Sequence, residues 1–500
     1  MWHIYRNVEW EWRSGGSKNN PKRHGEIDFL LVHKDFGVVM IEVKGGRGIT
    51  YNAKENRWLT WKNNKQIQIE GPYEQIQRNY HKLREKIQHE ASNLDLKNFR
   101  PRINSFVVWT NVNSNESKFG FMGYDENTFY KDDLVNPIEV EKRIKNQLDK
   151  YSHTCFSVAP YESYIELAER LSELVPISGA PKAAFFNSGA EAVENAVKIA
   201  RYFTNKKSIL SFKGGFHGRT YLAMGLTGKD KPYKEGFGPF PEFVKHAVYP
   251  YSYRDISDED ALISVNEVLN NTLDPQDTAA IVIEVELGEG GYIPASSNFL
   301  SQLRDICDTH NILLIFDEVQ TGYGRTGKMF GAETVGVTPD MVTLAKGIAG
   351  GFPLAAVLGK SEIMDSIHDA GIGSTFGASP ISCAAALGVL DAFDNEDILK
   401  NANKQAKTMN TVLSNLMNDF DFIGDVRGYG PMIGVEIVSD KESKNPDKEK
   451  TQQIISNCKE SGLLLVSCGE FGNVIRFMGP LTTPLEQVEE ALEIFSKSVI

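Results

Sequence analysis

The sequence predicts an α/β fold, with a mainly parallel sheet over roughly residues 151–500, preceded by a smaller α/β module. Three observations predict it. Short, fully apolar segments alternate with helical segments in the longer part, as in strands that are buried on both faces of a sheet. The composition changes near residue 150. Polar motifs stand directly after several apolar segments, where parallel sheets bind their ligands.

The two parts differ in charge and aromatic content. The chain has 500 residues, a net charge of −12 and a pI near 5.5, values that argue against a nucleic-acid binder. The net charge is +5 over residues 1–150 and −17 over residues 151–500, and all six tryptophans lie in the first 110 residues. This split indicates two modules of different origin.

Cysteine spacing and hydropathy bound the location of the protein. The five cysteines fit neither a zinc site nor a disulfide framework, and isolated thiols in an acidic chain predict a cytoplasmic protein. Residues 1–13 carry charges and lack the apolar run of a signal peptide. No apolar stretch reaches the ~18 residues of a membrane span, so no membrane partner is expected.

The first part reads as strands followed by a helix. Apolar runs over residues 29–33 and 38–43 predict a strand pair. Amphipathic spacing predicts a helix over residues 73–89, and residues 106–110 form another expected strand. Residues 140–151 are expected to form a helix that joins the two parts.

The second part alternates strands and helices. The expected strands are 183–186, 208–212, 279–284, 312–316, 341–344 and 355–358, and the expected helices are 161–174, 191–203 and 297–310. Short, mainly apolar strands that are separated by helices are typical of a parallel sheet that is covered on both faces.

The turn Asn187–Ala190 follows the first of these strands and opens a helix. Gly189 and Ala190 keep the turn small, so its backbone N–H groups and the positive helix end suit a phosphate. An ordinary glycine turn with a helix cap explains the same residues.

Asp317 and Lys346 each follow an apolar strand. A carboxylate at Asp317 suits the protonated ring nitrogen of a pyridine cofactor, and a partly desolvated lysine has the lowered pKa of a carbonyl-reactive amine. Taken singly, each is more often a turn aspartate or a solvated loop lysine. Three such motifs in one α/β region favour a common cofactor site.

These motifs resemble those of the class III aminotransferases, which use pyridoxal 5′-phosphate (PLP). The segments with this resemblance are Asn187–Asn195, Phe212–Thr220, Glu284–Gly291, Phe316–Gly327, Leu344–Pro353 and Ser374–Pro380. The resemblance runs from about Asp149 to the C-terminus, and His153–Phe156 looks most like the 4-aminobutyrate aminotransferases. It implies PLP fold type I, with a large PLP-binding domain over 154–385 and a small C-terminal α+β domain over 386–500.

The resemblance also implies a role for each cofactor residue. Lys346 is expected to hold PLP covalently and to move a proton, while Asp317 holds the ring nitrogen. Thr375 is expected to reach the phosphate of a neighbouring subunit, which implies a homodimer. The other implied cofactor residues are Ser188, Gly189 and Ala190 at the phosphate, Gln320 at the ring hydroxyl, Phe216 against the ring, and His217 and Glu284.

Two arginines indicate the substrates that the resemblance implies. Arg219 matches the position that holds the distal carboxylate of the amino donor, and Arg476 matches the position for the α-carboxylate of 2-oxoglutarate; a guanidinium binds a carboxylate with two hydrogen bonds. Glu289 resembles the carboxylate that pairs with Arg476 while a smaller substrate is bound. The expected reaction moves an amino group from 4-aminobutyrate, or a similar ω-amino acid, to 2-oxoglutarate. A surface ion pair is the alternative reading of each arginine.

The chain departs from the family pattern in two places. Glu286, in a segment that lacks its usual proline, adds a negative charge that is expected to lie near the cofactor ring. Residues 1–140 look unrelated to the N-terminal segment of the family, and residues 1–138 are expected to form a separate domain. The transferase is therefore expected to be N-terminally truncated, after a junction over residues 139–153.

The first part has its own candidate site. Asp28 is followed 14 positions later by Glu42, with Lys44 two residues beyond. Two acids and a lysine on adjacent strands suit a Mg²⁺ site that activates water, although a solvated strand with an ion pair gives the same pattern. With Gly71–Gln75, these residues resemble the nuclease-related (NERD) domain over about residues 3–135. Nucleic acid is expected as a partner only through this domain.

Two alternatives to the aminotransferase reading follow from this domain. In the first alternative, the chain is a NERD-type Mg²⁺-dependent nuclease or nucleic-acid-binding protein. In the second, it is an inactive fusion of two partial modules.

Overall fold

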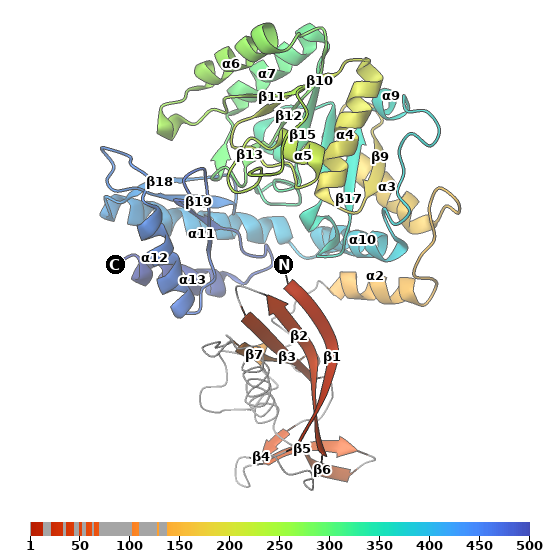
Figure 1. Ribbon diagram of the computed structural model, residues 1–500, viewed down its shortest axis with the longest axis vertical. Helices are drawn as coiled ribbons and strands as arrows, with labels where there is room; N and C mark the ends of the chain where they lie inside the picture. The colour runs from red at the N-terminus through yellow and green to blue at the C-terminus, as the bar shows by residue number, and fades with distance from the viewer. Residues whose placement is uncertain are drawn as a thin grey trace. The chain divides into compact units, whose positions relative to one another are not determined.

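The structure of the chain is a computed structural model that describes residues 139–500 in full and residue 138 by its backbone alone. Before them it describes only strand backbone, over residues 2–13, 22–33, 37–44, 50–52, 57–62, 65–69, 103–109 and 128–129. The chain divides into two compact units, Met1–Asn136 and Pro137–Ile500. Figure 1 labels many of the elements of both units.

The strands that the structure describes in unit 1 form two sheets. In the larger sheet, β2 (Lys22–His33) is antiparallel to β1 (Trp2–Arg13) and to β3 (Gly37–Lys44), and β3 is parallel to β7 (Ile103–Trp109), which pairs with β8 (Thr128–Phe129). The smaller, antiparallel sheet consists of β4 (Thr50–Asn52), β5 (Arg57–Lys62) and β6 (Lys65–Ile69). The three predicted strands are confirmed. The predicted helix over residues 73–89 lies outside the described residues.

Unit 2 is built on a seven-stranded sheet in the order β11-β10-β12-β15-β16-β17-β9. Its strands are β9 (Lys182–Phe186), β10 (Ser208–Phe212), β11 (Val244–Ala247), β12 (Thr278–Ile283), β15 (Leu313–Asp317), β16 (Met341–Leu344) and β17 (Ala355–Gly359). Only β17 runs against its neighbours within this sheet. The predicted mainly parallel sheet is confirmed, and each predicted strand lies within two residues of an observed one.

The central strands of the sheet are buried on both faces because apolar residues occupy most of their positions. In β12, Ile281 and Ile283 join one hydrophobic cluster, whereas Ala280 and Val282 join another on the opposite face. Leu314 of β15 likewise faces the first cluster. Period-two alternation sends successive side chains to opposite faces, so each strand stabilises two helical layers.

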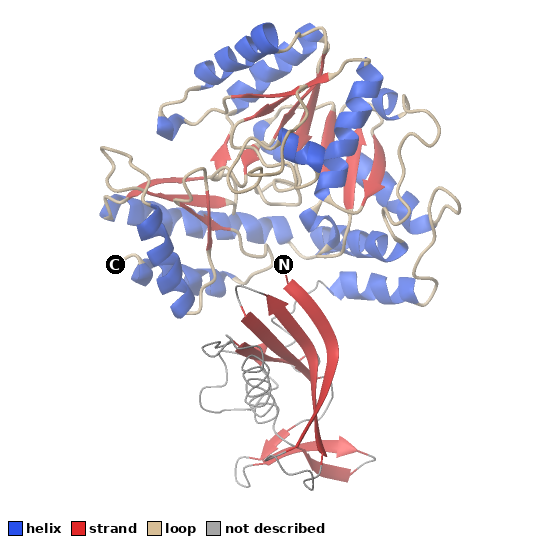
Figure 2. Cartoon of the chain, in the orientation of Figure 1, coloured by secondary structure: helices blue, strands red, loops and turns tan. Residues whose placement is uncertain are grey.

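The helices cover both faces, as Figures 1 and 2 show. Side chains of α4 (Gly189–Thr204), α5 (Tyr221–Leu226) and α9 (Ser361–Met364) join one cluster, and those of α3 (Glu162–Leu174), α6 (Asp258–Glu267), α7 (Ser297–His310), α8 (Gly331–Val335) and α10 (Pro380–Asn395) join the other. Helix α2 (Ile138–Leu148) packs on α10 through the fully buried Val140. The helix expected to join the two parts is therefore packed into unit 2.

A second, antiparallel sheet lies near the C-terminus, in the order β18-β19-β21-β20. Its strands are β18 (Ile423–Arg427), β19 (Ile433–Ile437), β20 (Val466–Cys468) and β21 (Val474–Phe477), and its helices are α11 (Ile398–Asp419), α12 (Lys448–Glu460) and α13 (Leu485–Ser498). Leu413, Ile454 and Phe495, one from each helix, share a core with β19 and β21.

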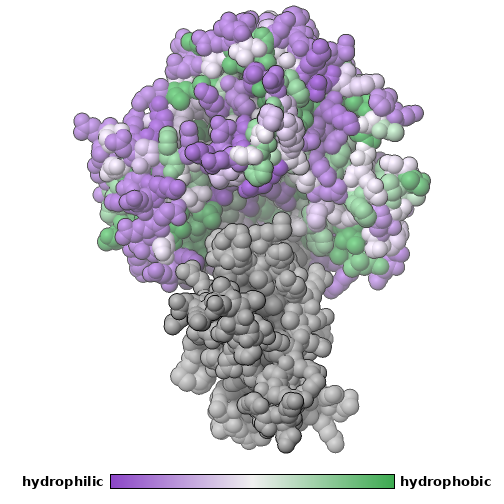
Figure 3. Space-filling view, viewed as in Figure 1, coloured by the Kyte–Doolittle hydropathy of each residue, from purple (hydrophilic) through white to green (hydrophobic). Residues whose placement is uncertain are grey.

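Hydrophilic residues cover most of the displayed face of unit 2, with apolar side chains in scattered patches (Figure 3). Among the helices that the structure describes, none combines the length and the apolar character of a membrane span.

Candidate active site

A cavity of about 420 Å³ opens at the carboxyl ends of β9, β10, β12, β15 and β16. Parallel strands bring these ends to one edge of the sheet. Ten of the thirteen residues predicted for the cofactor and substrate site line the cavity: Ser188, Gly189, Ala190, Phe216, His217, Glu284, Glu289, Asp317, Gln320 and Lys346. The sequence motifs therefore describe one place in the fold.

The turn at Ser188 forms the N-terminus of α4. Its Oγ accepts the N–H of Glu191 at 3.3 Å, as a helix cap does. Gly218 packs against this turn with φ of +135°, and a Cβ there would lie 2.8 Å from Cβ of Ala190, so only glycine lets the two loops approach. The free N–H groups of a 16-residue helix provide an anion site at this end of the cavity.

Asp317 presents a buried carboxylate to the cavity. Its Oδ2 lies 2.7 Å from Nδ1 of His217, and its Oδ1 accepts hydrogen bonds from Thr343 Oγ1 at 3.0 Å and Val319 N at 3.1 Å. Burial lowers the pKa of His217, but the hydrogen bond to Asp317 and its charge outweigh that effect, so the pKa lies above its usual value. Asp317 therefore favours the charged form of His217.

Lys346 follows β16 and points its amine into the cavity, where Nζ donates a hydrogen bond to Oε1 of Gln320. Its φ of +46° is in the left-handed region, which costs a residue with a side chain ~1–2 kcal/mol. The residue is exposed through the cavity mouth, yet the protein around the amine lowers its pKa, against the raising effect of Glu284 and Asp317. A lowered pKa makes this amine a better nucleophile.

Two glutamates that are close in sequence lie in different surroundings. Glu284 lines the cavity and accepts N–H groups from Phe216 at 2.8 Å and Gly288 at 3.0 Å. Glu286, which was expected near the cofactor ring, is instead buried against the backbone N–H of Tyr429, 2.8 Å away. The pairing of β13 (Glu286–Leu287) with β14 (Ile293–Pro294) directs it there, and burial raises its pKa well above the usual value. That expectation was wrong.

Glu289 joins the two parts of the predicted substrate site. Its Oε1 accepts a hydrogen bond from Nη1 of Arg476 at 2.6 Å, and its Oε2 accepts one from the hydroxyl of Tyr233 at 2.7 Å. Burial raises the pKa of Glu289, but the hydrogen bonds from Tyr233 and Arg476 lower it by more. The net pKa is below the usual value, so the carboxyl group stays charged. Arg219 lies over the Tyr233 ring, 4.8 Å from its centroid. Sequence reasoning missed Tyr233, which no local motif indicates.

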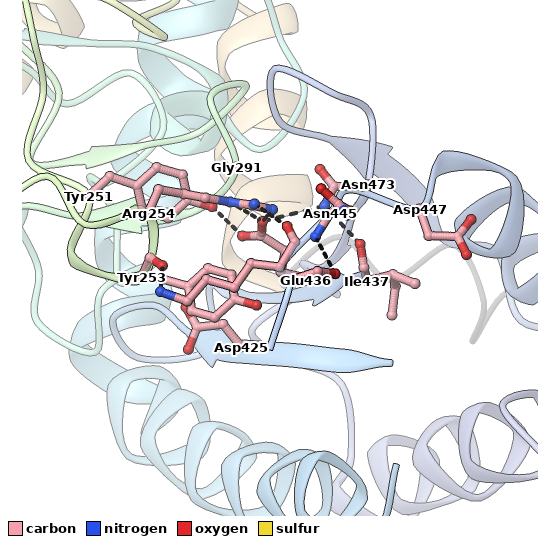
Figure 4. Close-up of polar contacts among 12 residues, drawn as sticks. Tyr251, Tyr253, Arg254, Gly291, Asp425, Glu436, Ile437, Asn445, Asp447 and Asn473 are labelled. Carbon is pink, nitrogen blue, oxygen red and sulfur yellow. Dashed lines mark hydrogen bonds and ion pairs between the residues drawn. The ribbon is translucent and has the colours of Figure 1, made fainter. Parts of the chain in front are cut away.

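A buried polar network fixes the segment behind Glu289 (Figure 4). Glu436 of β19 accepts hydrogen bonds from Tyr251 and Arg254, which precede α6, and from Arg427 of β18 at 2.7 Å. Arg427 also donates to the carbonyl of Gly291 at 2.7 Å. This bond ties the second sheet to the turn between β13 and β14, because Gly291 lies two residues after Glu289 in that turn.

Thr375 lies outside the cavity, and three predicted residues belong to unit 1. Thr375 is exposed outside the cavity, beside Ser374, whose Oγ accepts a hydrogen bond from Asn187 Nδ2 at 3.0 Å. In unit 1, Asp28 lies in β2 and Glu42 in β3, adjacent to the paired residues Phe29 and Ile41. Lys44 ends β3. The side chains of the residues in unit 1 are outside the described structure.

The cavity in unit 2 thus offers an anion site, a buried carboxylate and an amine with a lowered pKa. These groups fit the phosphate, the ring nitrogen and the reactive carbonyl carbon of PLP.

Comparisons with known proteins agree with this geometry. A family model described as aminotransferase class-III matches residues 136–499, and one described as nuclease-related domain matches residues 1–110. The chain is 45% identical over 359 residues to a 5-aminovalerate aminotransferase of Pseudomonas putida and equally to a 4-aminobutyrate aminotransferase of Escherichia coli. Each match covers 72% of this chain and 84% of the relative.

Solved structures show the same fold. A Bacillus anthracis aminotransferase matches with a TM-score of 0.69 and 30% identity, over 73% of this chain and 86% of the other. A PLP-bound amine transaminase from an uncultivated Pseudomonas species matches with a TM-score of 0.68 and 30% identity, over 73% of this chain and 87% of the other.

Proposed function

The chain belongs to the class-III aminotransferase family, and from that premise we propose that unit 2 is a PLP-dependent ω-aminotransferase acting between 4-aminobutyrate, or a near homologue such as 5-aminovalerate, and 2-oxoglutarate. The supporting observation is the single cavity that holds Lys346 and Asp317 together with Glu289, which pairs with Arg476. A nuclease reading explains none of these contacts.

Each cavity residue has a distinct task in this proposal. When bound, PLP supplies an electron sink for the charge left on the substrate carbon. Ser188 and the N–H groups of Gly189 and Ala190 hold its phosphate, and Asp317, oriented by His217 and Thr343, holds the ring nitrogen. Lys346 Nζ anchors the cofactor covalently and then moves a proton at the substrate carbon.

The other cofactor contacts are proposed because their residues line the same cavity. Phe216 packs against the ring, Gln320 faces the ring hydroxyl, and Glu284 holds the loop of Phe216 and Gly288 through their N–H groups. Glu284 is therefore proposed to shape the cofactor site through the loops that line it.

Arg219 and Arg476 are proposed to divide the substrate carboxylates between them. An ω-amino donor has one carboxylate, which Arg219 binds, and Glu289 then neutralises the unused Arg476 at 2.6 Å. The second carboxylate of 2-oxoglutarate takes the place of Glu289 on Arg476, because a guanidinium binds a carboxylate with paired, charge-assisted bonds. One cavity thus accepts both partners of the transfer.

The proposal is tested on the full chain supplied with PLP. We expect 4-aminobutyrate or 5-aminovalerate to be consumed only in the presence of 2-oxoglutarate, with one glutamate formed for each donor molecule lost. A protein that binds PLP but forms no glutamate from either donor would contradict the proposed activity.

Two wider properties belong to the same proposal. We propose a homodimer, in which the exposed Thr375 contacts the phosphate held by a second copy. A cytoplasmic location is supported by the five free cysteines, of which only Cys155 is not buried.

A second proposal concerns unit 1. The match to the nuclease-related domain and the register that puts Asp28 and Glu42 on paired strands favour a Mg²⁺ site with Lys44. Mg²⁺-dependent cleavage of DNA or RNA by the full chain should then disappear in Asp28→Ala. Cleavage that persists in this variant would locate the activity elsewhere.

A further inference from the structure

Tyr233 contacts residues of both proposed carboxylate sites, Glu289 at one and Arg219 at the other. It lies in a turn between α5 and β11, where its hydroxyl donates to Glu289 at 2.7 Å and its ring lies 4.8 Å from the guanidinium carbon of Arg219. We propose that Tyr233 determines selectivity between substrates with one and two carboxylates, because its hydroxyl holds Glu289 on Arg476 while its ring supports Arg219. This inference deepens the proposed function and rests on it.

The first step concerns the two oxygens of Glu289. Oε1 takes the hydrogen bond from Arg476 and Oε2 the one from Tyr233, so both bonds hold the same orientation of the carboxylate. A substrate carboxylate that reaches Arg476 must displace Glu289 and therefore also disturbs its bond with Tyr233. The hydroxyl adds to the cost of accepting a second carboxylate.

The neighbouring cation Lys229 does not replace this contact. Its Nζ donates to the carbonyl of Gly469 at 2.8 Å and to the backbone carbonyl of Glu289 at 3.4 Å. Lys229 therefore fixes the backbone of this segment, whereas Tyr233 fixes the side chain that moves.

The second step concerns the ring. Arg219 is exposed, and its guanidinium carbon lies near two aromatic rings, that of Tyr233 and, at 5.9 Å, that of Phe216. The Tyr233 and Phe216 rings also contact each other, with centroids 4.9 Å apart. Cation–π contact with these rings orients Arg219. The ring and the hydroxyl of Tyr233 consequently act on different carboxylate sites, and substitutions can separate them.

The test measures affinity by calorimetry on the PLP-loaded full chain, using two unreactive acids of equal length. Glutarate has two carboxylates and valerate has one. Tyr233→Phe should lower the Kd for glutarate about tenfold, the size of a lost hydrogen bond to a charged group, and change the Kd for valerate less than about twofold. Tyr233→Leu, which also removes the ring, should weaken valerate binding.

Tyr221→Phe is the matched control, because it removes a hydroxyl that donates to the Pro239 carbonyl outside the cavity. It should leave both affinities unchanged. An unchanged or raised Kd for glutarate in Tyr233→Phe overturns the inference, as does an equal change for both acids.

Glu289→Gln gives a second, independent readout, because it removes the charge that pairs with Arg476. In this background Tyr233→Phe should no longer alter glutarate binding, as expected when two residues act through one contact. A persisting effect overturns the inference.

The binding readout also separates this inference from the proposed function. Wild-type protein that binds both acids but transfers no amino group refutes the proposed function and still tests Tyr233. Wild-type protein that does not bind glutarate refutes the selectivity inference directly.

Discussion

Nδ1 of His217 lies 2.7 Å from Oδ2 of Asp317, and the two residues are only 3% and 2% exposed. Such a pair is costly to break, because removing one partner leaves the other buried without compensation. The Thr343 hydroxyl and the Val319 N–H hold the other oxygen of Asp317. The carboxylate therefore keeps a fixed orientation towards the cavity.

Replacing Asp317 should impair both cofactor binding and turnover. Asp317→Asn keeps the shape but removes the charge, so we expect kcat to fall ~10²–10³-fold, as for the loss of one preorganised electrostatic contact. A titration with PLP, followed by absorbance, should show a raised Kd for PLP. Thr343→Val removes only a neutral hydrogen bond to the same carboxylate, so it should lower kcat less than about tenfold. Equal effects of the two substitutions would contradict a role for the charge.

Lys346→Ala should abolish the visible absorbance of the PLP-loaded protein, because no amine remains to bind the cofactor covalently. Turnover should fall at least ~10²–10⁴-fold, the contribution of a positioned proton-transfer group. The control is Lys213→Ala, an exposed lysine in the Phe212–Thr220 motif, which should behave like wild type. An unchanged spectrum in Lys346→Ala would reassign the cofactor lysine.

Glu284 should make stability depend on pH. Burial raises its pKa to about 7, because the His217 charge offsets burial only in part. The unfolded value is ~4.3, so the folded state binds the extra proton between these values, and stability falls as pH rises through this window. The loss is on the order of 4 kcal/mol.

Glu284→Gln should remove most of this dependence, which thermal unfolding at about pH 5 and about pH 8 measures. The exposed Glu267→Gln serves as the control and should retain the wild-type dependence. A Glu284→Gln variant whose midpoint still falls as steeply with pH would assign the effect to another group.

Conservative changes of the two arginines should separate the carboxylate sites. Arg476→Lys loses the paired hydrogen bonds of a guanidinium, and the KM for 2-oxoglutarate should rise ~10-fold or more, with little change in the KM for 4-aminobutyrate. Arg219→Lys should raise both values, because each substrate has a distal carboxylate. Steady-state kinetics with each substrate varied in turn measures both. A donor KM that rises in Arg476→Lys would contradict this division.

The central strands could be predicted because their inner positions form unbroken apolar runs, as over residues 279–283 of β12 and 313–316 of β15. The edge strand β11 (Val244–Ala247) was not predicted, since lysine and histidine occupy its middle. In β19, Glu436 interrupts the apolar pattern, and its burial depends on Arg254 and Arg427. Long-range charges of this kind leave no local pattern in the sequence.

The cofactor residues could be predicted because parallel strands bring their carboxyl ends together, which places Ser188, Asp317 and Lys346 in one cavity. Contacts made by turns followed no such rule. Tyr233 precedes its partner Glu289 by 56 residues and lies in a turn. Glu286 was misplaced because its direction depends on the pairing of β13 with β14.

The Glu436 network has a consequence for protein engineering. Arg476 contacts Glu289 from the second sheet, and Glu436 of that sheet is bonded to Tyr251 and Arg254, which lie between β11 and α6. A chimera that exchanges only residues 398–500 with a relative would import the arginine without the partners that fix its sheet. Crossover points for recombining such enzymes should therefore keep residues 251–254 and 423–437 from the same parent.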